Sequence, residues 1–186
     1  MLISKFFADG INISEELKAY SNEVNISFPD QLSAFLAAYN GGETPRTTFS
    51  CGGESSDVVA FYGLGDVKYS YSNVRPFEWE GKWYLPIAFD SFGNDIVIST
   101  LSGAVYFRDH ETSRITQLTD DLRAFIQACT SKGIDPDTFK SIQEREQDLI
   151  RRGRGHMLTD ALRNMWQAEI DKYSCMTLEN VTVQQD

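Results

Sequence analysis

Acidic residues and a histidine gather at the ends of a series of short apolar segments. Asp90 and Asp95 flank one turn, and Asp109, His110 and Glu111 follow a later segment. Paired carboxylates beside a histidine can share a cation or move protons. Acidic side chains also cap turns at strand ends, and the chain has only 2 histidines. We therefore expect these residues to shape turns, and we expect no catalytic, metal or cofactor site.

Other motifs that could support chemistry are incomplete. Cys51, Cys129 and Cys175 are far apart and form no Cys-x-x-Cys pair, which argues against a zinc site or a disulfide framework. Gly52-Gly53 and Gly63-x-Gly65 lack the following Lys-Ser/Thr or the third glycine of a phosphate loop. No serine or cysteine has the flanking sequence of a known nucleophile motif. The sequence therefore predicts that the protein is not an enzyme.

Aromatic residues lie among acidic ones between residues 77 and 83. Exposed aromatic rings supply contact area in protein interfaces, and neighbouring acids steer a basic partner. The alternative is that the rings are partly buried as a lid over the core. We predict that a protein partner, itself basic, binds the following residues: Glu78, Trp79, Glu80, Trp83, Asp90 and Asp95.

The charge distribution excludes some classes of partner. The net charge is −10, with 17 acidic and 9 basic residues in 1–130 against 10 and 8 in 131–186. Nucleic-acid binders concentrate positive charge, so the balance argues against that class. Arg151, Arg152 and Arg154 lie near Asp148 and Asp160, where they are expected to form a solvated helix end. Solvation alone also explains an acidic surface of this kind.

The length and the apolar runs limit the organisation of the chain. Its 186 residues can bury one ordinary core, and 41% are hydrophobic. No run approaches the roughly 18 apolar residues of a membrane span. The first ten residues lack the features of a secretory signal. We expect a cytoplasmic protein with no membrane partner.

Three apolar runs, residues 83–89, 96–100 and 104–107, are separated by turn residues. This spacing predicts a meander of three antiparallel strands. Alternation places Ile96 and Ile98 on the core face and predicts a semi-polar opposite face. Val105 and Phe107 are the matching core residues of the third strand.

The flanking segments complete an α+β fold: a twisted, mainly antiparallel sheet of about five or six strands with helices packed against it. Helices are expected to start at Ser14, at Pro29, after Thr119-Asp120-Asp121, at Asp135-Pro136 and at about Thr159. Further strands are expected over 47–51 and 58–62, whereas 66–82 reads as irregular or weakly helical. The predicted domains are residues 1–130 and a helical C-terminal extension, 131–186, on the same core. The tail from residue 177 is expected to be a short edge strand or disordered.

The meander also carries a family resemblance. Pro86-Ile-Ala-Phe-Asp90, Gly93-Asn-Asp-Ile-Val-Ile98 and Gly103-Ala-Val-Tyr-Phe-Arg-Asp-His-Glu111 occur in this order, after Phe28-Pro29-Asp30 and Tyr39-Asn40-Gly41-Gly42. Over residues 14–130 the chain resembles the SUKH superfamily, which groups bacterial toxin-immunity proteins with fungal cell-wall-synthesis regulators.

The resemblance implies an immunity protein that binds and neutralises a cognate bacterial toxin, such as a nuclease or another nucleic-acid-modifying toxin. Two alternatives remain open. One is a regulatory interaction scaffold of the cell-wall-regulator type. The other is an unrecognised enzyme that uses the cluster of Asp90 and His110.

Overall fold

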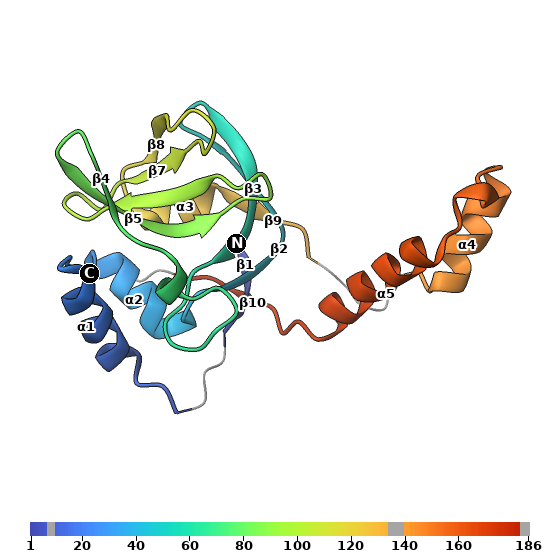
Figure 1. The fold of residues 1–186 in the computed structure, drawn as a ribbon, viewed down its shortest axis with the longest axis horizontal. Coiled ribbons are helices and arrows are strands. Elements are labelled where there is room, and N and C mark those ends of the chain that lie inside the picture. Colours follow the sequence, from blue (N-terminus) through green and yellow to red (C-terminus); the bar gives the residue numbers. More distant parts are fainter. Residues whose placement is uncertain (7–9, 134–139, 183–186) are drawn as a thin grey trace. The chain divides into compact units, whose positions relative to one another are not determined.

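The structure is a computed structural model that describes residues 1–6, 10–133 and 140–182. It divides into two compact units. The first comprises Met1–Lys132 together with Leu178–Asp186, and the second is Gly133–Thr177. We call them the sheet unit and the helical unit (Figure 1).

The sheet unit contains a ten-stranded sheet in which all strand pairs are antiparallel. The main path runs β10-β1-β2-β3-β5-β6-β7-β8, with β4 beside β5 and β9 beside β2. The strands are β1 Leu2–Lys5, β2 Gly42–Cys51, β3 Glu54–Phe61, β4 Phe77–Trp79, β5 Lys82–Phe89, β6 Asp95–Ser99, β7 Val105–Arg108, β8 Ile115–Thr119, β9 Cys129–Ser131 and β10 Glu179–Asn180.

The prediction of an α+β fold with a mainly antiparallel sheet is confirmed, but the predicted number of five or six strands is wrong. Three of the additional strands, β1, β4 and β9, are 3 or 4 residues long. Such segments are too short to show the alternation that identifies a strand in a sequence. They form because longer neighbouring strands offer them free backbone groups.

The predicted meander is present as β5, β6 and β7. Ile96, Ile98 and Val105 are completely buried in the main core, as their alternation predicts. The opposite face, however, is not semi-polar, because Val97 and Tyr84 are also fully or almost fully buried. Aromatic residues of β4 and β7 cover this second face, as described below.

Helices α1 Ile13–Val24 and α2 Asp30–Tyr39 precede the long strands. Asn12, rather than the expected Ser14, is the N-cap of α1, and it makes no side-chain cap bond. The predicted left-handed exit from α2 is confirmed at Asn40, with φ 50°. The next residue, Gly41, must be a glycine, since an added Cβ would lie 2.5 Å from the carbonyl oxygen of Tyr62.

The core lies between the sheet and α2 and α3. Helix α3 Leu122–Ala128 starts at Asp121, whose carboxylate accepts the N–H of Ala124 at 2.6 Å. Its Phe125 ring lies 6.5 Å from that of Phe61, which also meets the ring of Phe35 from α2 at 5.1 Å. Helix α3 ends at Ala128, where the chain leaves the helix to form β9 against β2.

The helical unit contains α4 Ile142–Arg151 and α5 Asp160–Ser174. Ser141 and Glu144 form a capping box at α4, and Thr159 caps α5. The helix start expected at Asp135-Pro136 lies outside the described residues. In the tail, β10 pairs with β1, so the expected edge strand is present. Among the described residues, no helix has the length and apolar character of a membrane span.

Candidate functional site

The aromatic segment that was predicted to bind a partner forms the hairpin of β4 and β5. Glu80 and Gly81 form its two-residue turn with φ of 49° and 73°, and Trp79 pairs with Lys82. Two left-handed residues match the twist of the strands they join. The expectation that residues 66–82 are irregular is therefore wrong for β4. The Glu80-Gly81 pair between alternating residues is the sequence signal for this hairpin.

The two faces of the hairpin carry different residues. On one face the ring of Phe77 stacks on that of Tyr84 at 5.7 Å, and the ring of Trp79 meets Tyr84 edge-on at 6.3 Å. Tyr84 also contacts the ring of Tyr106 at 5.2 Å, and Arg108 lies 4.2 Å from the centre of Phe77. Burial raises the pKa of Tyr84. The rings of Phe77 and Trp79 therefore cover Tyr84, as expected from the alternative prediction that the aromatic residues are partly buried as a lid.

Glu78 and Trp83 form a cross-strand pair, whereas Phe77 and Trp79 alternate with Glu78. The Trp83 side chain is 46% exposed, and it lines a groove of about 340 Å³ with the segment that follows α1. Trp79 therefore packs on the sheet, while Trp83 and Glu78 belong to a separate, accessible surface.

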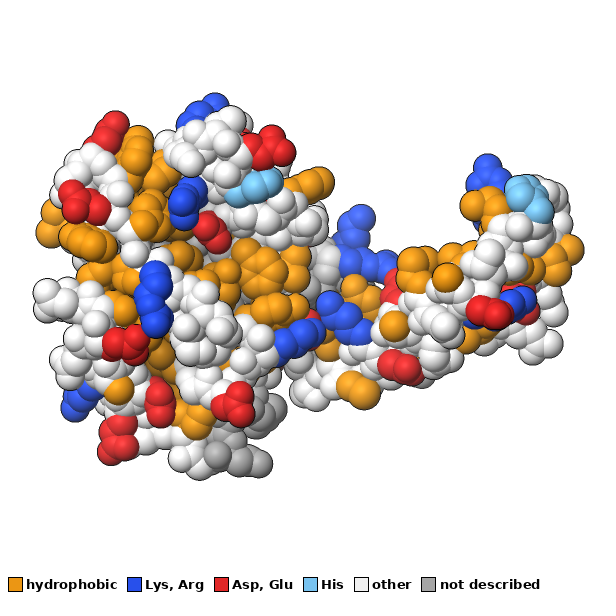
Figure 2. Space-filling model, in the orientation of Figure 1, with side chains coloured by type: hydrophobic (Ala, Val, Ile, Leu, Met, Phe, Trp, Pro, Cys, Tyr) orange, Lys and Arg blue, Asp and Glu red, His pale blue; other side chains and the backbone are white. Residues whose placement is uncertain are grey.

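A second groove of about 350 Å³ adjoins the first, and the two share Thr100 and Leu101 of the β6–β7 turn. Leu101 is 87% exposed, which is unusual for an apolar side chain of this size. We use the name Trp83 surface for the following residues: Glu78, Glu80, Trp83, Thr100 and Leu101. Figure 2 shows that hydrophobic and acidic side chains lie next to one another on the visible face of the sheet unit.

Asp90, one of the predicted partner-binding residues, does not lie on an exposed surface. It is only 2% exposed. Its carboxylate accepts the backbone N–H groups of Phe92 and Asn94 at 2.9 and 2.8 Å, the Asn94 side-chain amide at 2.8 Å and the Ser56 hydroxyl at 2.7 Å. The carboxylate therefore closes the β5–β6 turn.

Asp95 lies at the same end of the sheet as Asp90, and its pairing partner Phe89 is six residues along β5 from Trp83. That spacing corresponds to roughly 20 Å along a strand. Asp95 pairs with Arg108 at 3.4 Å. Burial raises its pKa, and the nearby Arg108 partly opposes this effect. The structure thus does not bring Asp90 and Asp95 to the Trp83 surface.

The Asp109-His110-Glu111 group is organised as a turn. The Asp109 carboxylate accepts the N–H groups of Glu111 and Thr112 at 3.0 and 2.7 Å, and these hydrogen bonds, chiefly from Thr112, lower its pKa. A ring nitrogen of His110 lies 2.9 Å from the Asn94 side-chain oxygen. Within the described residues, no three His, Cys, Asp or Glu side chains are grouped to hold a metal.

Sequence reasoning missed Leu101 and Thr100 as surface residues. The sequence indicates only that Leu101-Ser102-Gly103 is a turn between two strands. An apolar residue inside a turn, with no place in the strand alternation, was the available signal. Leu101 lines a groove together with the segment after α1, which includes Ile26. Only the folded chain brings that segment beside Leu101.

An antiparallel sheet covered by helices defines an α+β domain. The chain belongs to the SMI1/KNR4 family (SUKH-1), whose family model matches residues 14–128. No curated protein and no solved structure matches the chain. The matched range begins in α1 and ends with α3, so the helical unit lies beyond it.

Proposed function

We propose that the protein is an immunity protein that binds and neutralises a cognate bacterial toxin, without catalysis, in the cytoplasm. The observation that carries the proposal is the Trp83 surface. There a half-exposed tryptophan and an almost fully exposed leucine lie beside grooves, with the exposed acids Glu78 and Glu80 on the same hairpin. Aromatic anchors of this kind supply much of the binding energy in protein interfaces.

The charge of the chain supports a basic partner. The sheet unit carries most of the net charge of −10. A nuclease or another toxin that acts on nucleic acid needs a basic substrate cleft, because the phosphate backbone dominates its substrate's charge. An acidic protein placed over such a cleft is attracted by it and excludes the substrate.

The proposal is tested by co-expressing the protein with the toxin encoded beside its gene. We expect the wild-type protein to restore growth. We expect the Trp83→Ala variant to bind the toxin with a dissociation constant about thirtyfold higher, as for loss of an aromatic anchor worth about 2 kcal/mol. Phe92→Ala is the matched control. Phe92 is 70% exposed but lies in the β5–β6 turn, at the other end of β5.

Two outcomes would contradict the proposal. If both variants bind as tightly as the wild type, the Trp83 surface is not the interface. If no neighbouring toxin is neutralised and deletion of the gene instead alters envelope synthesis, the regulatory-scaffold alternative is correct.

A further inference from the structure

The helical unit has an apolar surface that its two helices do not bury. Neither α4 nor α5 contains a buried residue, although both helices are fully described. Six large apolar side chains are exposed among the described residues, and three of them, Ile150, Met157 and Met165, belong to this unit. Hydrophobic side chains are visible along it in Figure 2. A unit as small as Gly133–Thr177 rarely builds a sufficient core alone, and oligomerisation is one common remedy.

Helix α5 is apolar over more of its circumference than one neighbouring helix covers. Its half-buried apolar residues, on the side where Arg145 of α4 lies over a ring, are Leu162, Trp166 and Ile170. We use the name outer face for a second row, which is exposed: Ala161, Met165, Ala168 and Lys172. At about 100° per residue the apolar residues of the two rows span roughly 200° of the helix. A stripe that faces a single core is about half as wide.

The outer face has the spacing of a helix-packing seam. Its residues follow the pattern i, i+4, i+7 and i+11 from Ala161 to Lys172. Alternating steps of four and three residues keep side chains on one side of a helix, where a second helix can pack along them. The missing cover of the outer face is therefore expected to be a helix.

The charge of the chain favours a second copy as the source of that helix. The helical unit has 8 acidic and 7 basic residues, whereas the sheet unit has 19 and 10. Two sheet units therefore repel each other much more than two helical units do. A basic toxin would be drawn to acidic residues, and the outer face contains none.

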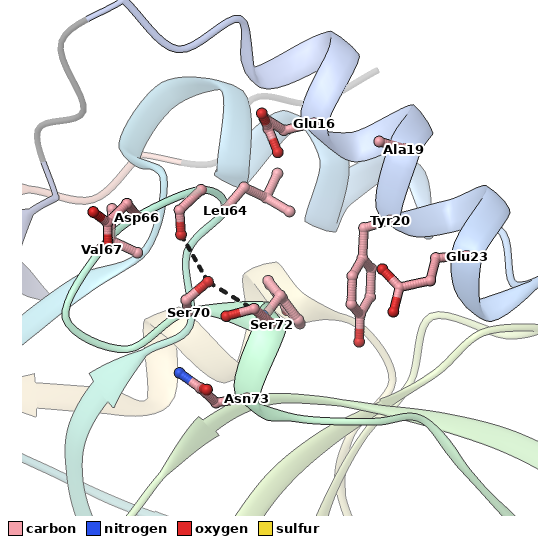
Figure 3. Close-up of a pocket in the computed structure, with 12 residues that line it drawn as sticks. Glu16, Ala19, Tyr20, Glu23, Leu64, Asp66, Val67, Ser70, Ser72 and Asn73 are labelled. Carbon is pink, nitrogen blue, oxygen red and sulfur yellow. Dashed lines mark hydrogen bonds between the residues drawn. The ribbon is translucent and has the colours of Figure 1, made fainter.

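Helix α1 of the sheet unit does not offer a comparable surface. Its residues Glu16, Tyr20 and Glu23 line a cavity of about 430 Å³ together with Asp66 (Figure 3). Tyr20 is only 6% exposed, and none of the lining residues, all of them described, is basic. The accessible part of this lining is acidic, so two copies of it would repel each other.

We propose that two copies of the chain associate through the outer face of α5, with their α5 helices antiparallel. Each helix has an acidic residue, Asp160, in its first turn and a basic residue, Lys172, in its last turn. An antiparallel pair places Lys172 of one copy beside Asp160 of the other, whereas a parallel pair places like charges together. The Asp160 side chain is 93% exposed even in its pair with Arg163, so a second copy can reach it. Antiparallel helix dipoles also attract each other.

The antiparallel arrangement also matches the side chains of the outer face by size. Aligning Met165 with Ala168 of the second copy sets Lys172 opposite Ala161, because both pairs have the same sequence spacing. Each long side chain then lies against a small one. The arrangement has two-fold symmetry, so every contact occurs twice and the assembly closes as a dimer.

The association is tested by analytical ultracentrifugation of the whole protein from about 1 to about 500 µM, which spans micromolar dissociation constants. The contact is one pair of helices, so we expect a dissociation constant of about 10–100 µM and a monomer near 1 µM. Met165→Glu should raise the constant at least about thirtyfold, because it buries an unpaired carboxylate in the contact. A reducing agent is kept present, since exposed Cys175 could otherwise link two copies covalently.

The matched control is Gln167→Glu, which adds the same charge to α5 about 200° around the helix from Met165. Gln167 is exposed and donates a hydrogen bond to Asp171 at 2.7 Å. This variant should leave the dissociation constant within about threefold of the wild-type value. Circular dichroism near 1 µM shows whether the monomer of each variant is folded.

A charge exchange tests the antiparallel direction. Lys172→Glu should raise the dissociation constant about tenfold, because it brings like charges together at both ends of the helix pair. The double variant Asp160→Lys/Lys172→Glu restores opposite charges and should bind within about threefold of the wild type. Equal weakening by the single and the double variant would exclude the antiparallel pair.

Two other results would overturn the proposal. A dimer that Met165→Glu does not weaken uses another surface. A monomer at every concentration means that two copies do not cover the outer face. In that case a loss of unfolding free energy in Met165→Glu would assign the cover to the sheet unit, and a loss of toxin affinity would assign it to the toxin. Because the ultracentrifugation uses no toxin, failure of the dimer and failure of the proposed immunity function give different results.

Discussion

The sheet unit and the helical unit use the same sequence pattern with different results. In α2 the apolar residues Leu32, Phe35, Leu36 and Tyr39 recur at helical spacing, and all four are buried. In α5 the corresponding stripe is Leu162, Met165, Trp166 and Ile170, yet no residue of this fully described helix is buried. Met165 is 59% exposed.

Polar contacts, rather than a buried apolar core, join the two helices of the helical unit. In the helical unit Arg145 of α4 pairs with Glu169 of α5 at 2.7 Å and lies 5.8 Å from the centre of the Trp166 ring. Arg163 pairs with Glu146 at 2.5 Å. The two helices are therefore joined by partly exposed ion pairs, which stabilise much less than a buried apolar core.

The comparison shows that periodicity identifies the apolar face of a helix but does not show whether another element covers it. Covering requires a partner with a complementary face. The sheet provides one for α2 and α3, and α4 and α5 have only each other within the helical unit.

The largest expected difference between the two units is in the loss of stability when an apolar side chain is truncated. Phe35→Ala should lower the free energy of unfolding by about 3–5 kcal/mol, because the ring contacts Phe61 and Tyr39 in the core. Met165→Ala, in α5, should change it by less than about 0.5 kcal/mol. Denaturant melts of both variants provide the measurement. Similar losses for the two would show that the helical unit has a core of its own.

Cysteine reactivity provides a second contrast. Burial raises the pKa of Cys129 to about 12, whereas Cys175 at the end of α5 is exposed. Only the thiolate reacts, so at pH 8 Cys175 should react with a disulfide reagent roughly a thousandfold faster than Cys129. Mass spectrometry of partly modified protein measures the two rates. The thiolate fraction of Cys129 should become substantial only near pH 12, and comparable rates at pH 8 would mean that β9 opens readily.

Removing a polar side chain should also lower the free energy of unfolding more in the sheet unit than in the helical unit, but by a smaller margin than core truncation. Asp90→Ala removes an acceptor from four donors and leaves them buried or constrained, so we expect a loss of about 2–3 kcal/mol in unfolding free energy. Arg145→Ala, in the helical unit, should cost about 1 kcal/mol or less. Thermal melts of the two variants test this order. A larger effect at Arg145 would assign the stability of the helical unit to its ion pairs.

A limited effect on the sheet unit is expected from removing the helical unit. Its two ends leave the sheet at neighbouring points, because Leu2 N–H donates to the Ser131 hydroxyl at 2.8 Å and Leu2 pairs with Asn180. Replacing residues 133–177 with a short Gly-Ser linker should leave the sheet unit folded, with an unfolding free energy within about 2 kcal/mol of that of the whole chain. Circular dichroism and denaturant melts are the measurements. Loss of cooperative unfolding would show that the two units depend on each other.

Much of the sheet unit could be predicted from the sequence. Alternation in residues 96–107 identified the core face, and the glycine-containing turns separated the strands of the meander. The family resemblance placed the same residues in the SUKH group, and the family model confirms it. These features are local, so spacing and residue type are sufficient to reveal them.

The short strands and the accessible surface could not be predicted in the same way. β9 forms only because β2, more than seventy residues earlier in the chain, has a free edge. Trp79 and Trp83 look alike in the sequence, yet register places Trp79 on Tyr84 and leaves Trp83 half exposed. Asp90 was predicted to bind a partner, but its donors come from residues brought together by the turn and by β3.

The sequence by itself determined the charge, the family, the core face of the meander and the positions of most helices, because these follow from residue type and local periodicity. The tertiary structure decided which apolar stripes are covered, which acids are accessible and where the cavities lie. Those properties depend on contacts between segments distant in the chain, and such contacts leave no periodic signal in either segment.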